Sequence, residues 1–187
     1  MRQIIVRQEE KLTDHSSLNI GTKAIVGDVF QVPISEECVG FGQILAIYKE
    51  EMLLMAIFDM RAGYDEVPSI ESIISARPIF ICNSLDAKIW HGQWKIIGNH
   101  PPDSAKILLP NYKVKVGDGF YVENYAADKT RLCKNEELAS LEFRSCVAPI
   151  RLENALKAHW GFVPWNDAYN ALLAENALKS TLVVVDQ

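Results

Sequence analysis

Three apolar runs near the start of the chain constrain its fold more than any other feature. They are Val29–Ile34, Phe41–Tyr48 and Met52–Phe58, and two short polar breaks, Ser35–Cys38 and Lys49–Glu51, separate them. Short runs rich in Val, Ile, Phe and Tyr and bounded by turn residues are typical of β-strands. Because the breaks are short, we expect neighbouring strands to pair antiparallel, as a meander.

The pattern within the runs indicates how the strands are buried. Phe30, Val32 and Ile34 share one parity, so they should lie on one buried face. The third run, Met52–Phe58, is apolar at every position, which predicts a central strand covered on both sides.

The remainder of the chain predicts short strands followed by helices, an α+β order. Helical spacing is found at Pro68–Ser75, Pro149–Trp160 and Asn166–Lys179. Strand composition is found at Pro78–Cys82, Ile107–Leu109, Tyr112–Val116, Phe120–Val122 and Thr181–Val185, with a hairpin over Ile89–Ile97 that turns at Gly92 and a surface loop over Asn124–Glu137.

These elements predict one fold and one division of the chain. The expected fold is α+β, a strongly bent antiparallel sheet or partly open β-barrel packed by two or three helices. We expect an N-terminal arm over residues 1–25 and a single α+β domain over residues 26–187, with its sheet core at 26–122 and its helical part at 148–179.

Composition excludes several classes of function. A net charge of −5 over 187 residues argues against a nucleic-acid groove and suits a basic partner. The first residues carry no secretory pattern, and the longest apolar run is too short to span a membrane. Four cysteines without a C-x-x-C pair indicate reduced thiols. We therefore expect a cytoplasmic protein that contacts neither membrane nor nucleic acid.

Candidate catalytic and metal-binding residues are few and scattered. Gly40-Phe41-Gly42 lies between two predicted strands and lacks the third glycine of a phosphate loop, which favours a bulge or close backbone approach. No histidine has a second ligand at metal-site spacing, and no local signature pairs Cys38 or Cys82 with a base. We expect no catalytic residue, metal or cofactor. The histidines are His15, His91, His100 and His159.

Candidate partner-binding residues are acidic and aromatic. The pairs Glu36-Glu37, Glu50-Glu51 and Asp65-Glu66 fall at predicted turns, where ordinary solvated loops are the simplest explanation. If several such turns share one edge of the sheet, they could attract a basic partner. Trp165 follows a short connection between two predicted helices, where an aromatic ring can anchor an interface. The predicted contacts are Glu36, Glu37, Glu50, Glu51 and Trp165.

Three short motifs resemble one known family. They are Gly27-Asp28-Val29-Phe30-Gln31-Val32-Pro33, then Gly40-Phe41-Gly42-Gln43-Ile44-Leu45, then Trp94-Lys95-Ile96-Ile97-Gly98-Asn99-His100-Pro101. Their pattern, G-D-x-F-x-x-P, a glycine-flanked aromatic strand and W-x-x-I-G-x-x-P, resembles the immunity protein 26 family of bacterial polymorphic-toxin systems. The resemblance extends over about Gly27 to Pro110.

This resemblance implies a cytosolic protein that binds and neutralises a cognate toxin, with no catalysis of its own. Our hypothesis for the mechanism is that the protein covers the active site of the toxin domain. If the toxin is a nuclease, its substrate groove is basic, and an acidic inhibitor complements it. Two alternatives stay open. One is a small-molecule or peptide-binding β-barrel module of a regulatory protein, with a pocket beneath Trp90 and Trp94. The other is a hydrolase that uses His91, His100 or Cys38.

Overall fold

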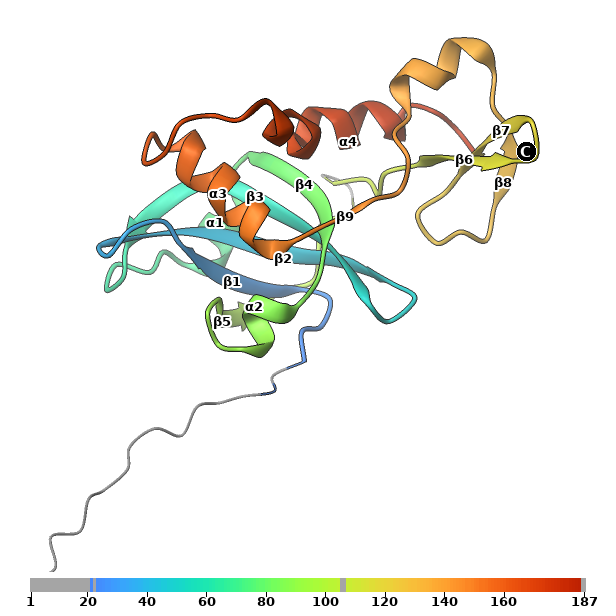
Figure 1. The fold of residues 1–187 in the computed structure, drawn as a ribbon. Coiled ribbons are helices and arrows are strands. Elements are labelled where there is room, and N and C mark those ends of the chain that lie inside the picture. Colours follow the sequence, from blue (N-terminus) through green and yellow to red (C-terminus); the bar gives the residue numbers. More distant parts are fainter. Residues whose placement is uncertain (1–20, 22, 105–106, 186–187) are drawn as a thin grey trace, which may run out of the picture.

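The computed structural model describes Gly21, residues 23–104 and residues 107–185, and these form two β-sheets and several helices (Figure 1). Most of the arm predicted at residues 1–25 lies outside the described residues, so that division of the chain stays a prediction. The larger sheet has the order β5-β1-β2-β3-β4-β9 and the smaller one β6-β7-β8. The strands are β1 (Asp28–Pro33), β2 (Cys38–Tyr48), β3 (Met52–Gly63), β4 (Pro78–Ser84), β5 (Lys95–Asn99), β6 (Tyr112–Val116), β7 (Gly119–Glu123), β8 (Thr130–Leu132) and β9 (Cys146–Val147).

The predicted meander is confirmed. β1 pairs antiparallel with β2, and β2 pairs antiparallel with β3. β3 lies between β2 and β4, and its side chains alternate between two apolar cores: Met55 and Ile57 pack on one face, Leu54 and Phe58 on the other. Met52–Phe58 is therefore a central strand covered on both sides, as its continuous apolar composition predicts.

The sheet is bent without closing. β5 pairs with β1 rather than with its neighbour in sequence, and β5 and β9 form the two edges of the larger sheet. The β2–β3 register shifts twice, between Gly40 and Gly42 and between Ile44 and Ala46, and such bulges increase twist and bend a strand. The predicted α+β class with a bent antiparallel sheet is confirmed.

Gly40 and Gly42 are required by close packing, as the sequence indicated. A Cβ at Gly42 would lie 2.6 Å from the ring of Phe30 and 2.7 Å from the backbone oxygen of Ala56. A Cβ at Gly40 would lie 2.7 Å from Leu156, which belongs to a helix on that face. Both glycines therefore let neighbouring layers approach the bulged part of β2.

We expect Gly42→Ala to destabilise the fold by about 1–3 kcal/mol, because the added carbon meets backbone that cannot rotate away. Gly98→Ala is the matched control, since its Cβ would meet the flexible end of Ile70 at 3.0 Å. Urea denaturation of both variants measures the difference. Equal losses at the two positions would contradict this account.

The helices lie on both faces of the larger sheet (Figure 1). They are α1 (Ile70–Ser75), α2 (Ala87–Trp90), α3 (Pro149–His159) and α4 (Ala174–Thr181), with 3₁₀ segments η1 (Asn135–Ser140) and η2 (Asp167–Leu172). α3 is confirmed. It ends at His159, with Trp160 as its C-cap, and Gly161 follows with a φ of +78°. The helix predicted over Pro68–Ser75 forms from Ile70, with Ser69 as its N-cap.

The helix predicted over Asn166–Lys179 is divided into η2 and α4. Asn166 caps η2, as expected, by accepting a hydrogen bond from the backbone N–H of Ala168. Leu173 then forms an isolated antiparallel bridge with Phe80 of β4, which breaks the helix. The division therefore results from pairing with a residue distant in sequence.

Three other elements differ from the prediction. Ile89–Ile97 is not a hairpin: Ala87–Trp90 is helical, and Lys95–Asn99 pairs with β1. Ile107–Leu109 has no strand structure. Thr181–Val185 is not a strand, because Thr181 ends α4 and Val183 and Val185 pack beneath the smaller sheet with Val122 and Leu141. The region Asn124–Glu137, predicted as a loop, contains β8 and the start of η1.

Arg144 joins the two sheets. Its guanidinium lies 4.0 Å from the ring centroid of Tyr48, at the end of β2, and 4.1 Å from that of Tyr112, at the start of β6. Tyr125 lies 5.3 Å away, and Glu123 accepts a hydrogen bond at 2.9 Å. Stacked guanidinium–aromatic contacts of this kind stabilise most when they are desolvated, as here.

Glu153 anchors α3 to the sheet, although it is only 6% exposed. Its carboxylate accepts hydrogen bonds from Lys88 at 2.6 Å, from Lys157 at 2.7 Å and from the indole of Trp94 at 3.1 Å. The Trp94 ring in turn stacks on Phe30, with centroids 5.4 Å apart. Burial alone raises the pKa of Glu153, but these three hydrogen bonds more than offset it, so the pKa lies below its ordinary value.

We expect Glu153→Gln to destabilise the protein by about 2 kcal/mol, because both lysines lose their counter-charge. The loss stays below that of a fully buried pair, since the lysine side chains are 19% and 25% exposed. Glu175→Gln, in an exposed pair with Lys179 at 3.9 Å, should change stability by less than about 0.5 kcal/mol. Thermal and urea denaturation measure the stability of both variants. If both lose a similar amount of stability, Glu153 does not anchor α3 to the sheet.

Candidate partner-binding surface

The acidic turns named as partner contacts are exposed but lie at opposite ends of the sheet. Glu36 and Glu37 form the β1–β2 turn, and Glu50 and Glu51 form the β2–β3 turn (Figure 1). β2 connects the two turns and is 11 residues long, which corresponds to about 35 Å. These two turns therefore do not share one edge of the sheet, because consecutive hairpins reverse at alternate ends.

A further acidic pair lies at the same end as the β1–β2 turn. Cys38 pairs with Gly63 at the end of β3, and Asp65 and Glu66 follow directly. The Glu66 carboxylate and the Glu37 backbone oxygen both come within 3.8 Å of a Cβ built on Gly63. The two pairs together give this end a local negative charge.

Trp165 is half exposed and held in place. It lies between α3 and η2, is 42% exposed, and stacks on Phe80 with centroids 6.4 Å apart. Tyr169 meets it edge-on at 5.5 Å, and its indole N–H donates to the Asn170 side chain at 3.1 Å. A ring that its neighbours hold in place and that is still 42% exposed suits the role of an interface anchor.

Two apolar neighbours of Trp165 are also exposed, and the sequence analysis did not single them out. Phe162 is 46% exposed and Val163 is 37% exposed. With Trp165 they form what we call the apolar loop. The exposure of these residues could have been predicted from the sequence. Three large apolar residues lie between Gly161, which follows α3, and Asn166, which caps η2, so no helix face can bury them.

The base of the apolar loop is fixed to β3, towards the acidic end. Asp59 accepts a hydrogen bond from Arg77 at 3.0 Å and lies 3.1 Å from the ring nitrogen of His159. Arg61, which pairs with Gly40 across the sheet, lies 4.6 Å from the centroid of the Trp160 ring. The apolar loop and the Glu36–Glu37 turn therefore belong to the same end of the molecule, whereas Glu50 and Glu51 lie at the other.

The Asp59 contacts predict a pH dependence. Burial acts to raise the pKa of Asp59, but hydrogen bonds from Arg77 and His159 lower it, and the result lies below the ordinary 3.8. A carboxyl with a depressed folded-state pKa stabilises the protein fully above its unfolded pKa, and it loses this contribution as the pH falls through the folded value.

We therefore expect Asp59→Asn to lower the melting temperature at pH 6, and we expect this difference to shrink as the pH falls below the ordinary pKa of 3.8 towards the lower pKa of the folded state. Asp86→Asn is the control, because the Asp86 side chain makes no capping hydrogen bond. Calorimetric scans between pH 6 and pH 3 test this. A difference that stays constant over that range would refute it.

The alternative pocket beneath Trp90 and Trp94 does not form as expected. Trp94 is buried in the core, where it contacts Phe30 and Glu153. Trp90 is exposed on α2, and its backbone oxygen accepts a hydrogen bond from the Gly21 N–H. The sequence could not show that one of these tryptophans is buried and the other exposed, because both lie beside the same glycine turn.

The residues considered for hydrolysis make local contacts. The ring Nδ1 of His100 lies 2.8 Å from the carbonyl of Pro101, and the Cys38 thiol contacts the carbonyl of Val39 at 3.9 Å. All four cysteines are free. Within the described ranges, no three His, Cys, Asp or Glu side chains gather as metal ligands would. No helix in the part of the chain that the structure describes is long and apolar enough to span a membrane.

An exposed apolar loop that is held in place beside an acidic turn has the composition typical of protein–protein interfaces. A family model described as immunity protein 26 matches residues 25–120, and the chain belongs to this family. No curated protein and no solved structure matches the chain.

The motif residues that carry the family resemblance are structural. Gly27 has a φ of +92°, and a Cβ there would lie 2.8 Å from the backbone oxygen of His100. The Asp28 carboxylate accepts from the Ile25 backbone and from Asn99, both at 2.9 Å. Phe30 stacks on Trp94. These contacts join β1 to β5, so the matched segment supplies the scaffold.

Proposed function

We propose that the protein binds a cognate toxin and neutralises it by covering the toxin's active site. Family membership supports a toxin-neutralising role. The choice of surface rests on the apolar loop, whose Trp165 ring contacts Phe80 and Tyr169 and is still 42% exposed. Such preorganised aromatic groups contribute most to affinity, since little side-chain entropy is lost on binding.

The acidic end of the sheet would add selectivity. Glu36 and Glu37, together with Asp65 and Glu66, lie at the same end as the apolar loop, and the whole chain carries a net charge of −5. A toxin with a basic substrate groove, such as a nuclease, would be attracted to this end and held with its groove covered. The protein would act in the cytoplasm by stoichiometric binding, without a reaction of its own.

Glu50 and Glu51 would contribute less to such an interface than Glu36 and Glu37. A standard interface buries about 800 Å² on each partner, a patch roughly 30 Å across. The two acidic turns lie about 35 Å apart along β2. A partner of ordinary size centred on the apolar loop would therefore leave Glu50 and Glu51 at its rim or outside it, and only a partner that follows β2 would engage both turns.

The test begins with co-purification of the chain and the product of the adjacent upstream gene. We expect a stable complex and loss of the toxin's activity at one equivalent. Failure to co-elute with any toxin-like neighbour, or binding that leaves the toxin fully active, would contradict the proposal.

Variants of that complex locate the surface. Trp165→Ala should weaken binding by about 2 kcal/mol or more, as expected for an anchoring tryptophan. The double variant Glu36→Lys with Glu37→Lys should slow association with a basic toxin and reduce its salt dependence. The matched control, Glu50→Lys with Glu51→Lys, makes the same charge change at the other end and should have a smaller effect. Equal effects of the two double variants would place the interface elsewhere.

A further inference from the structure

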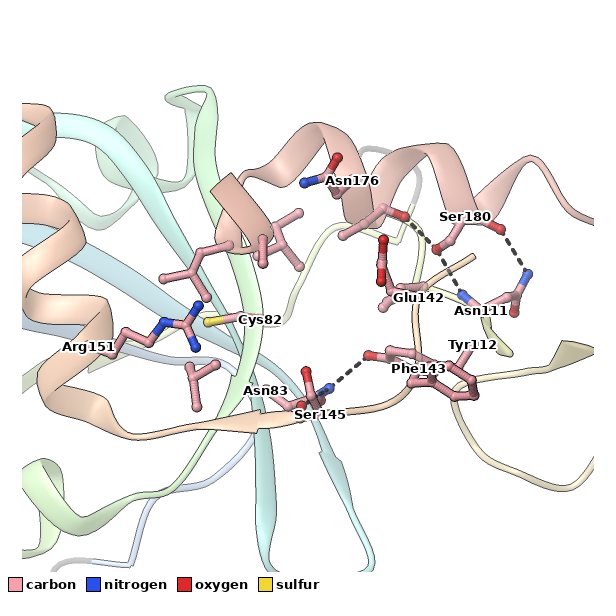
Figure 2. A pocket seen from close by; sticks show the side chains of 16 residues that line it. Cys82, Asn83, Asn111, Tyr112, Glu142, Phe143, Ser145, Arg151, Asn176 and Ser180 are labelled. Atoms are coloured by element: carbon pink, nitrogen blue, oxygen red, sulfur yellow. Dashed lines mark hydrogen bonds between the residues drawn. The ribbon is translucent and has the colours of Figure 1, made fainter. Parts of the chain in front are cut away.

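A cavity of about 100 Å³ lies where the edge of the larger sheet, helix α4 and the segment leading into β9 meet (Figure 2). The outer edge of β4 is bridged at Phe80 by Leu173 and pairs with β9 from Asn83 onwards. Between these points Ile81 and Cys82 pair with β3 on their inner side, but among the described residues they have no strand partner on the outer side, and both line the cavity. The cavity therefore lies along a gap in the pairing of the sheet edge.

Two opposite charges line this cavity without neutralising each other. Arg151, from α3, lies on the Cys82 side, and Glu142 lies towards α4 (Figure 2). The Arg151 Nη2 donates to the carbonyl of Ala168, while its Nε–H has no partner within the described residues. Neither Arg151 nor Glu142 forms an ion pair with any residue that the structure describes.

A buried amide in the same wall also lacks a partner. Asn83 is 3% exposed, and its side-chain N–H groups donate to the Tyr112 hydroxyl at 2.8 Å and to the carbonyl of Ser145 at 3.3 Å. These bonds fix the orientation of the amide. Its Oδ1 then has no donor in the described part of the chain. An unpaired buried acceptor has lost its hydrogen bonds to water, and a ligand N–H would replace them.

We propose that this cavity binds a small zwitterion, a compound with a carboxylate at one end and an ammonium at the other. Arg151 would hold the carboxylate, and Glu142 with the Asn83 Oδ1 would hold the ammonium. The cavity opens to the surface beside the exposed Glu142, and its volume of about 100 Å³ suits a short compound of this kind. The inference is independent of the toxin-binding surface, which uses other residues.

Binding without covalent chemistry is the expected outcome. Burial raises the pKa of the Cys82 thiol to about 12, with the nearby Cys146 adding to the shift and Arg151 opposing it. The thiol therefore stays protonated at neutral pH and is not a nucleophile.

A series of ω-amino acids measures the spacing of the two charges. Glycine, β-alanine, γ-aminobutyrate and 5-aminovalerate are titrated into the full chain, and the Arg151 Nε–H signal is followed by nuclear magnetic resonance. We expect one length to give saturable shifts in the millimolar range. Butyrate and butylamine, which each keep one charge, should bind at least tenfold more weakly. If they bind as well as the amino acids, or if no compound saturates, the proposal is overturned.

Variants tie the binding to the cavity. Glu142→Gln and Arg151→Met should each weaken binding at least tenfold. Ala177→Leu fills the cavity from α4 and should abolish binding while both charges stay in place. Lys179→Leu adds the same side chain to the exposed side of α4 and should leave binding unchanged. Binding that survives Ala177→Leu in a folded protein would place the ligand elsewhere and refute the site.

Discussion

The buried carboxylate of Glu153 holds together parts of the chain that are far apart in sequence. It accepts the indole N–H of Trp94, whose ring stacks on Phe30, so β1, the start of β5 and α3 meet at one point. A charge can be buried there because Lys88 and Lys157 both neutralise it. The position of α3, and with it the apolar loop at its end, depends on this contact.

The residues that carry the family match and the residues proposed to contact a partner are different ones. The family motif residues Gly27, Asp28 and Phe30 are used in contacts within the sheet. The family match ends at residue 120, whereas Trp165 and its apolar neighbours lie beyond it. A shared framework with a separately placed contact loop is what a family of inhibitors needs if each member is to fit its own partner.

Sequence reasoning succeeded where neighbouring residues decide the structure. The meander followed from apolar runs and short turns, and the close approach at Gly40 and Gly42 followed from small residues inside a strand. It failed where a distant partner decides. Lys95–Asn99 is a strand because it pairs with the edge of β1, and it is not part of a hairpin. Leu173 interrupts the predicted helix because it forms a bridge with Phe80. Propensity gives no information on such pairing.

The sequence by itself determined the α+β class, the order of the main strands, the course of α3 and the exposure of the acidic turns. Only the tertiary structure decided which of these turns share an end with Trp165, and which side chains surround Arg144 and Glu153. The physical reason is the sequence separation over which each kind of interaction acts. Periodicity and turn chemistry act over a few residues, whereas the Trp94–Glu153 contact joins residues 59 positions apart and exists only when sheet and helix have packed.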